Sequence, residues 1–170
     1  MGALSRQDPR DHERLVHQPP STGQDMTGPL NTRFAVAVHT LTLLAARPSD
    51  LVCSEDAALS VGTNPTHVRR VLAGLREAGL VASRSGPHGG WQLARDPQLI
   101  TLGDIWRAVQ GEDPLLVLHE GGNPGCPIGA HINECLEIVS GRTGRAVESE
   151  LDRMTLADVY HDTLTAGARV

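Results

Sequence analysis

The chain contains no lysine, few aromatic residues and no long hydrophobic run. All 15 basic residues are arginines, which we attribute to coding bias rather than to function. Aromatic residues make up only 2% of the chain, so a core must be built from Leu, Val, Ile and Ala. No apolar run approaches the roughly 18 residues that span a bilayer, and the N-terminus lacks the basic-then-apolar order of a secretory signal. We therefore expect a cytoplasmic protein without a membrane partner.

Sequence motifs of the common enzyme classes are also absent. The chain has no phosphate-binding loop, no dinucleotide fingerprint, no nucleophile elbow and no His-Glu-x-x-His motif. Its eight histidines show no clustered spacing. The three cysteines are an odd number, which argues against a disulfide framework in a cytosolic chain. The sequence therefore does not predict an enzyme.

Two helices are predicted in the first part of the ordered chain. Apolar residues at helical spacing indicate a helix over 32–46, which Pro48 ends. Ser54 has the properties of an N-cap, and two acids follow it where they favour the helix dipole. The pattern therefore predicts a second, short helix over 55–60.

A third helix begins at Asn64 and Pro65, which are preferred at the N-cap and at the first helical position. It is predicted to run to Ala78, with Gly79 in the place of a C-terminal cap. Its spacing directs four apolar side chains inward: Val68, Val71, Leu72 and Leu75.

A β-hairpin is predicted directly after this third helix. Two short strands over 81–84 and 91–94 flank the turn residues 85–90, and Thr101 then caps a helix to Gln110. Helix, short helix, tight turn, helix and hairpin is the order of a winged helix-turn-helix. We predict a mainly α fold with a small β-hairpin wing, followed by a long C-terminal dimerisation helix.

Positive charge is concentrated in one part of this acidic chain. The net charge is −5, yet residues 61–95 hold five arginines and a single acid. DNA affinity follows local phosphate contacts, so such a segment can bind DNA. We expect DNA contacts from the third helix and the wing, at Asn64, Thr66, His67, Arg69, Arg70, Arg84, His88 and Gly89.

Each of these residues also has a simpler interpretation. Arg70 can be a solvated helix charge, His67 can simply be exposed, and residues 85–90 can be only a hairpin loop. For Arg76 we favour the solvated charge. It is the ordered combination that points to DNA.

A stripe of apolar residues at intervals of three and four marks a long helix near the C-terminus. Such a stripe outside a compact domain suits pairing with a partner helix, although it can also pack within its own chain. The residues predicted for a dimer interface are Ile132, Leu136, Val139, Val147 and Leu151. The chain then divides into a disordered tail (1–30), a DNA-binding domain (31–111), a sensor loop (112–128) and a dimerisation segment (129–170).

Residues 63–72, 75–81 and 86–94, with 100–105 and 155–159, resemble the Rrf-type winged-helix regulators. That family includes the iron–sulfur cluster biogenesis regulator and the nitric-oxide-sensing repressor. The resemblance implies a homodimer that places each third helix in a major groove of double-stranded DNA. A dimer that covers a promoter blocks polymerase, so we favour a repressor. A winged helix that binds proteins rather than DNA is the alternative.

Several members of that family bind an iron–sulfur cluster through three closely spaced cysteines. This chain offers only Cys126 and Cys135 there, so a cluster would need other ligands, for which we considered His12, Glu13, His119, His131 and Glu134. A thiol switch is the second interpretation, because Cys126 precedes a helix, where thiol pKa values fall. The third is that both cysteines only pack, as we expect for Cys53.

Overall fold

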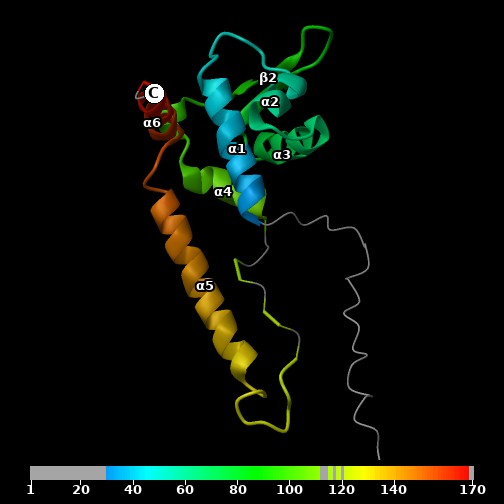
Figure 1. Ribbon diagram of the computed structural model, residues 1–170, viewed down its shortest axis with the longest axis vertical. Helices are drawn as coiled ribbons and strands as arrows, with labels where there is room; N and C mark the ends of the chain where they lie inside the picture. Colours follow the sequence, from blue (N-terminus) through cyan, green and yellow to red (C-terminus); the bar gives the residue numbers. More distant parts are fainter. Residues whose placement is uncertain (1–29, 112–114, 117, 120, 169–170) are drawn as a thin grey trace, which may run out of the picture.

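The computed structural model describes residues 30–111, 115–116, 118–119 and 121–168. The predicted tail lies outside these residues except at Leu30. The described part contains six α-helices and one two-stranded hairpin: α1 (Leu30–Ala45), α2 (Ser54–Val61), α3 (Pro65–Glu77), β1 (Val81–Arg84), β2 (Gly90–Leu93), α4 (Leu102–Gln110), α5 (Ile132–Leu151) and α6 (Leu156–Gly167). The mainly α fold with a small hairpin is confirmed (Figure 1).

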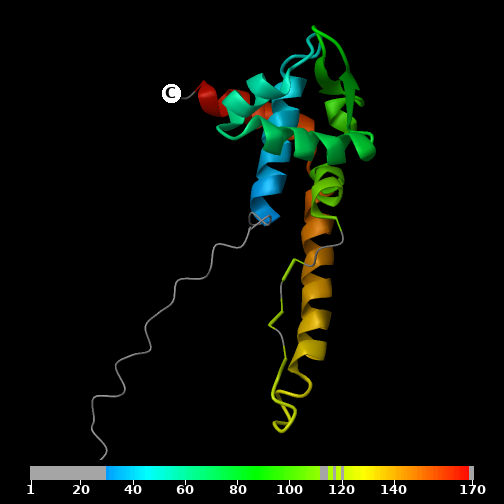
Figure 2. The same ribbon diagram turned by 90° about the vertical axis from the view of Figure 1, so that its right-hand side faces the viewer.

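Most of these elements form a head, and α5 projects from it. The head consists of α1 to α4, the hairpin and α6, whereas α5 extends away below it in both views (Figures 1 and 2). Helix α5 has 20 residues, so it is about 30 Å long. No helix in the described residues is long and apolar enough to cross a membrane. The boundaries of the four predicted segments stay predictions.

The core of the head is built from aliphatic side chains, as the scarcity of aromatic residues requires. All four apolar residues predicted to face inward from α3 are buried, and they join Leu41 and Leu44 of α1 and Ile105 of α4. Burying each such side chain contributes about 1.5–3 kcal/mol. Phe34 and Trp106 add an edge-to-face contact with ring centroids 5.4 Å apart. This packing fixes which face of α3 points outward.

The N-cap predicted for α2 is wrong by one residue. Cys53 holds that position, and its thiol accepts a hydrogen bond from the Asp56 N–H at 3.3 Å. Ser54 is instead buried, and its hydroxyl accepts from Trp91 Nε1 at 3.2 Å. Cys53 therefore caps a helix rather than serving only as a small apolar residue. The sequence could not show that Trp91 of β2 reaches Ser54.

The ends of α3 follow the predicted chemistry closely. Asn64 Oδ1 accepts a hydrogen bond from the Thr66 N–H at 2.7 Å, and Pro65 is the first helical residue. At the other end Ala78 is the C-cap and Gly79, with φ of 68°, follows it. The chain then turns directly into β1, so the hairpin lies close to the end of α3.

Helices α4, α5 and α6 meet at a junction that we call the clasp, made by Thr101, Asp104, Arg107, Asp152 and Thr155. Arg107 donates from Nη2 to Asp152 Oδ1 at 2.9 Å and from Nη1 to Asp152 Oδ2 at 3.1 Å. It also pairs with Asp104 at 3.0 Å. An isolated β-bridge joins Thr101 to Thr155, the N-caps of α4 and α6. The clasp therefore attaches the projecting α5 to the head.

We expect Asp152→Asn to lower the melting temperature at neutral pH. Hydrogen bonds from Arg107 hold the pKa of the Asp152 carboxyl below its ordinary value. A lowered folded-state pKa contributes stability above the unfolded-state pKa of about 3.9, and that stability is lost as pH falls through the folded-state pKa. The gap between wild type and Asp152→Asn should therefore close in strong acid. Thermal unfolding followed by circular dichroism measures it.

The control for this experiment is Asp162→Asn, which removes an acid from an exposed position of α6. The Asp162 carboxylate has no ion pair among the described contacts, so its removal should leave the melting temperature nearly unchanged. Equal effects of the two substitutions at neutral pH would contradict a stabilising role of the clasp.

Candidate DNA-binding surface

The exposed face of α3 and the hairpin lie on the same side of the head. In Figure 1 they stand to one side of α1, and α6 stands to the other. Helix α3 has 13 residues and is about 20 Å long. Because its apolar residues are directed into the core, its polar residues Thr66, Arg69, Arg70 and Arg76 are left exposed.

Arg69 and Arg70 differ in their surroundings although they are adjacent. The guanidinium of Arg69 donates from Nη2 to Glu55 Oε1 in the first turn of α2 and forms an ion pair with that carboxylate. The described contacts contain no hydrogen bond or ion pair of the Arg70 side chain. Both side chains are exposed, so both guanidinium groups can reach an approaching duplex.

Two other residues predicted to contact DNA are partly engaged within the protein. Asn64 Oδ1 caps α3, so this side chain is already held by the backbone of the helix. His67 Nε2 is buried and has no hydrogen-bond partner in the described part of the chain. Their side chains are thus less available to a duplex than those of Thr66, Arg69 and Arg70.

The hairpin turn presents Arg84 and His88 to solvent. Strands β1 and β2 pair antiparallel, with Arg84 opposite Gly90 at the base of the turn. Gly89 donates from its N–H to Gly86 O at 2.9 Å, and a Cβ at Gly89 would collide with the Arg84 carbonyl oxygen. Gly89 therefore shapes the turn, and the absence of a side chain there permits close approach to a ligand.

Arg76 has a contact that its interpretation as a solvated charge did not include. Its guanidinium carbon lies 6.0 Å from the ring centroid of Trp91 on β2, within the range of a cation–π interaction. Arg76 is exposed, as expected of a solvated charge, and it also links the last turn of α3 to the hairpin. The contact joins residues far apart in the sequence, so no local pattern could have indicated it.

Glu55 is the residue at this surface that the sequence analysis missed. The sequence indicated only that the Glu55 carboxylate interacts favourably with the helix dipole in the first turn of α2. The structure adds an ion pair with Arg69, in which the side chains are 59% and 52% exposed. An acidic residue shortly before a basic helix was the only signal available.

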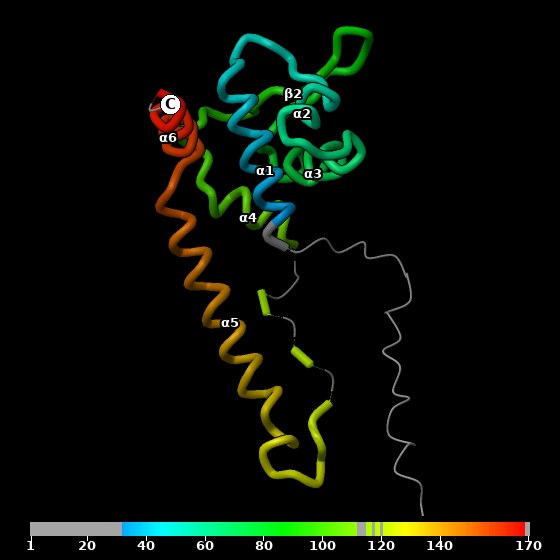
Figure 3. Tube along the Cα trace, viewed as in Figure 1, coloured from blue at the N-terminus to red at the C-terminus, as the bar shows by residue number. Residues whose placement is uncertain are grey.

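Cys126 belongs to the turn that precedes α5. Figure 3 shows this turn at the end of α5 that is farthest from the head. Backbone N–H groups of Gly129 and Ile128 stabilise its thiolate and lower the pKa of the thiol. Helix α5 begins only at Ile132. The sequence suggested that the start of the following helix lowers this pKa. The structure instead attributes the lowered pKa of Cys126 to the local turn before α5.

A complete ligand set for an iron–sulfur cluster is not gathered in the described residues. They contain no group of three or more His, Cys, Asp or Glu side chains placed to hold a metal. Cys135 is exposed on α5 and Cys126 is half-buried. The candidate ligands His12 and Glu13 lie outside the described residues. The donors that are described therefore do not fit a cluster within one chain.

The predicted dimer residues lie along α5 with different exposure. Val139 is 49% exposed, and Ile132, Leu136 and Val147 are half-buried. Leu151, at the end nearest the head, packs in part against the core of its own chain. Ile138 is 61% exposed but lies on another face of the helix, because it is one residue from Val139.

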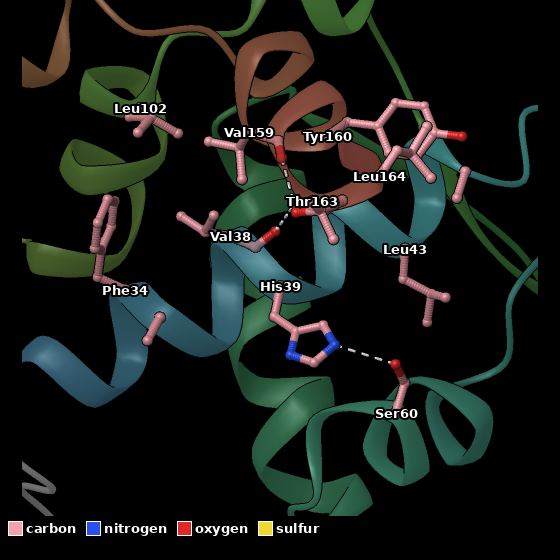
Figure 4. Close-up of a pocket in the computed structure, with 13 residues that line it drawn as sticks. Phe34, Val38, His39, Leu43, Ser60, Leu102, Val159, Tyr160, Thr163 and Leu164 are labelled. Carbon is pink, nitrogen blue, oxygen red and sulfur yellow. Dashed lines mark hydrogen bonds between the residues drawn. The ribbon is translucent and has the colours of Figure 1, made fainter. Parts of the chain in front are cut away.

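A groove of about 600 Å³ separates α1 from α6 (Figure 4). Its lining is mostly apolar. The hydroxyls of Thr42 and Thr163 donate hydrogen bonds to backbone carbonyls of their own helices. His39 Nε2 lies 3.1 Å from Ser60 Oγ, as in a base and nucleophile pair. The described residues supply no carboxylate that contacts His39, so the third member of a catalytic triad is missing there.

Comparisons with known proteins agree with this geometry. The model of the Rrf2 family, described as iron-dependent transcriptional regulators, matches residues 30–162. Over 132 residues the chain is 40% identical to the putative HTH-type transcriptional regulator YwnA of Bacillus subtilis. The match covers 78% of this chain and 97% of YwnA.

Solved structures of related regulators share the fold. T. potens IscR has a TM-score of 0.58 and 28% identity, and the match covers 82% of this chain and 91% of that one. CymR, the global cysteine regulator of B. subtilis, has a TM-score of 0.57 and 26% identity, with 79% and 98% covered.

The family match extends from α1 into α6 and so includes the whole basic surface described above. The predicted winged helix and the resemblance on which it was based are both confirmed. The chain is a DNA-binding transcriptional regulator and not an enzyme. It belongs to the Rrf2 family.

Proposed function

We propose that the chain acts in the cytoplasm as a homodimeric, operator-binding repressor that reads DNA with α3. The observation that carries the proposal is the exposed pair Arg69 and Arg70 on α3, with Arg84 and His88 of the hairpin on the same side of the head. These side chains concentrate positive charge on one surface of a chain whose net charge is −5. That surface is suited to a polyanion.

The dimensions of this surface suit duplex DNA. The major groove is about 12 Å wide and admits a single helix. A guanidinium can bind guanine through two hydrogen bonds, or it can bind a phosphate. A hairpin beside the helix can then contact the sugar–phosphate backbone, which positions the protein without reading sequence. Arg69 and Arg70 are the candidates for base contacts, and Arg84 is the candidate for a phosphate.

Pairing through α5 supports the dimer. Val139 is half-exposed on a helix that leaves the head, where the α5 helix of a second copy would cover it. A twofold dimer would present two copies of α3 to half-sites about one helical turn, or 34 Å, apart. A protein that spans two turns of a promoter excludes polymerase, so repression is the simplest outcome of binding.

The input signal is proposed to act at the Cys126 thiol. Backbone N–H groups lower its pKa, and thiolates are the species that oxidants attack. The lack of a gathered ligand set in the described residues favours thiol chemistry over a cluster held within one chain. Oxidation would add bulk and change the charge next to the start of α5.

Arg69→Ala and Arg70→Ala should each weaken binding to the promoter of the chain's own gene. A residue that reads a base is worth about 1–3 kcal/mol, or roughly 5- to 150-fold in dissociation constant. Arg84→Ala should weaken binding to all sequences alike and lower the salt slope by about 1. Fluorescence anisotropy at several salt concentrations measures both quantities.

The matched control is Arg145→Ala, because Arg145 is exposed on α5 rather than on α3 and lies away from the predicted dimer residues. It removes the same charge and should leave the affinity nearly unchanged. If Arg69→Ala and Arg70→Ala both behaved like this control, α3 would not be the recognition helix.

Val139→Glu should convert the dimer to monomers. A carboxylate buried in an apolar interface without a partner costs several kcal/mol, so the dissociation constant of the dimer should rise by about a hundredfold or more. Analytical ultracentrifugation measures the dissociation constant. Arg145→Glu is the control, since six residues rotate it by about 240° around α5. A dimer that tolerates Val139→Glu as well as the control would contradict the proposed interface.

Iodoacetamide should modify Cys126 faster than Cys135 at pH 7, although Cys135 is the more exposed thiol. The lowered pKa gives Cys126 a larger thiolate fraction than a thiol of the ordinary pKa, about 8.5. Peptide mass spectrometry after short labelling times gives both rates. Faster modification of Cys135 would rule out Cys126 as the reactive thiol.

A further inference from the structure

The ion pair between Glu55 and Arg69 places an acid inside the basic DNA-binding surface. Glu55 belongs to the first turn of α2, and Arg69 belongs to the second turn of α3. Their side chains contact each other although both are more than half exposed. An exposed pair of this kind contributes little to folding. Its position makes an effect on DNA binding more important than its effect on stability.

We propose that Glu55 competes with DNA phosphate for Arg69 and so lowers the affinity of this surface for DNA in general. The proposal rests on the proposed function, because it requires α3 to face the duplex. Non-specific binding depends almost entirely on phosphate contacts. An acid that occupies a guanidinium and repels phosphate therefore weakens binding to DNA that lacks the operator.

An operator can outweigh the loss of this ion pair. Two hydrogen bonds from a guanidinium to guanine change a binding constant by about 5- to 150-fold, whereas an exposed ion pair is worth about 1.4- to 5-fold. Binding to the operator therefore persists although Arg69 has to leave Glu55.

Asp56 provides a matched control within the same turn of α2. It is also exposed, and it also lies in the first turn, where an acid favours the helix dipole. Its carboxylate has no ion pair among the described contacts. Asp56→Asn therefore removes the same charge and the same dipole interaction as Glu55→Gln, but it leaves Arg69 paired.

The test uses the full chain and a non-operator duplex of about 30 base pairs, long enough for two half-sites. Binding is measured by fluorescence anisotropy for wild type, Glu55→Gln, Asp56→Asn, Arg69→Ala and the double variant Glu55→Gln/Arg69→Ala. Glu55→Gln should tighten binding by about 1.4- to 5-fold more than Asp56→Asn does, the range that exposed pairs span. The salt slope should become steeper by about 0.9 as Arg69 gains a phosphate.

The dependence on Arg69 decides the outcome. In the Arg69→Ala background, Glu55→Gln should have no more effect than Asp56→Asn has in the wild type. The inference, but not the proposed function, would be overturned by either of two results. One is that Glu55→Gln and Asp56→Asn change the affinity equally; the other is that Glu55→Gln has the same effect on affinity when Arg69 is absent. If Arg69→Ala itself leaves DNA binding and its salt slope unchanged, the inference fails together with the assignment of α3 as the recognition helix.

Discussion

The whole candidate DNA-binding surface depends on the burial of the apolar face of α3. Val68, Leu72 and Leu75 are fully buried, so rotation of α3 about its axis would expose them to water. Each such exposure costs about 1.5–3 kcal/mol, more than any single polar contact on the outer face contributes. The outward direction of Arg69 and Arg70 is therefore a consequence of core packing. Charge determines what this surface binds, whereas apolar packing determines where the surface points.

The same reasoning explains why the elements of the head were predictable from the sequence. Capping residues and helical spacing act within a few residues of each other, and Asn64, Pro65 and Thr101 have the roles that were expected. The error at α2 arose where a distant residue decided the outcome. Trp91 binds the Ser54 hydroxyl, so the N-cap moves to Cys53. Local chemistry predicted the elements, but not the contacts between residues far apart in the chain.

The candidate surface was predictable to a similar extent. The arginines of α3 and the glycines of the hairpin were identified from composition and turn chemistry. The partners of two arginines were not, because Glu55 lies 14 residues before Arg69 and Trp91 lies 15 residues after Arg76. Nor could spacing show that His67 Nε2 is buried, since the burial depends on packing around α3.

The shape of the molecule constrains how a signal at Cys126 can reach DNA. Cys126 lies beyond α5 at the far end from the head, whereas α3 lies within the head (Figures 1 and 3). In the proposed mechanism, a change at Cys126 would act on the pairing of α5 or would pass along α5 to the clasp. Both carboxylate oxygens of Asp152 accept hydrogen bonds from Arg107 of α4, and α4 packs against both α1 and α3. A displacement of α5 would therefore act on the head through these contacts, and in the proposed dimer it would change the separation of the two α3 helices.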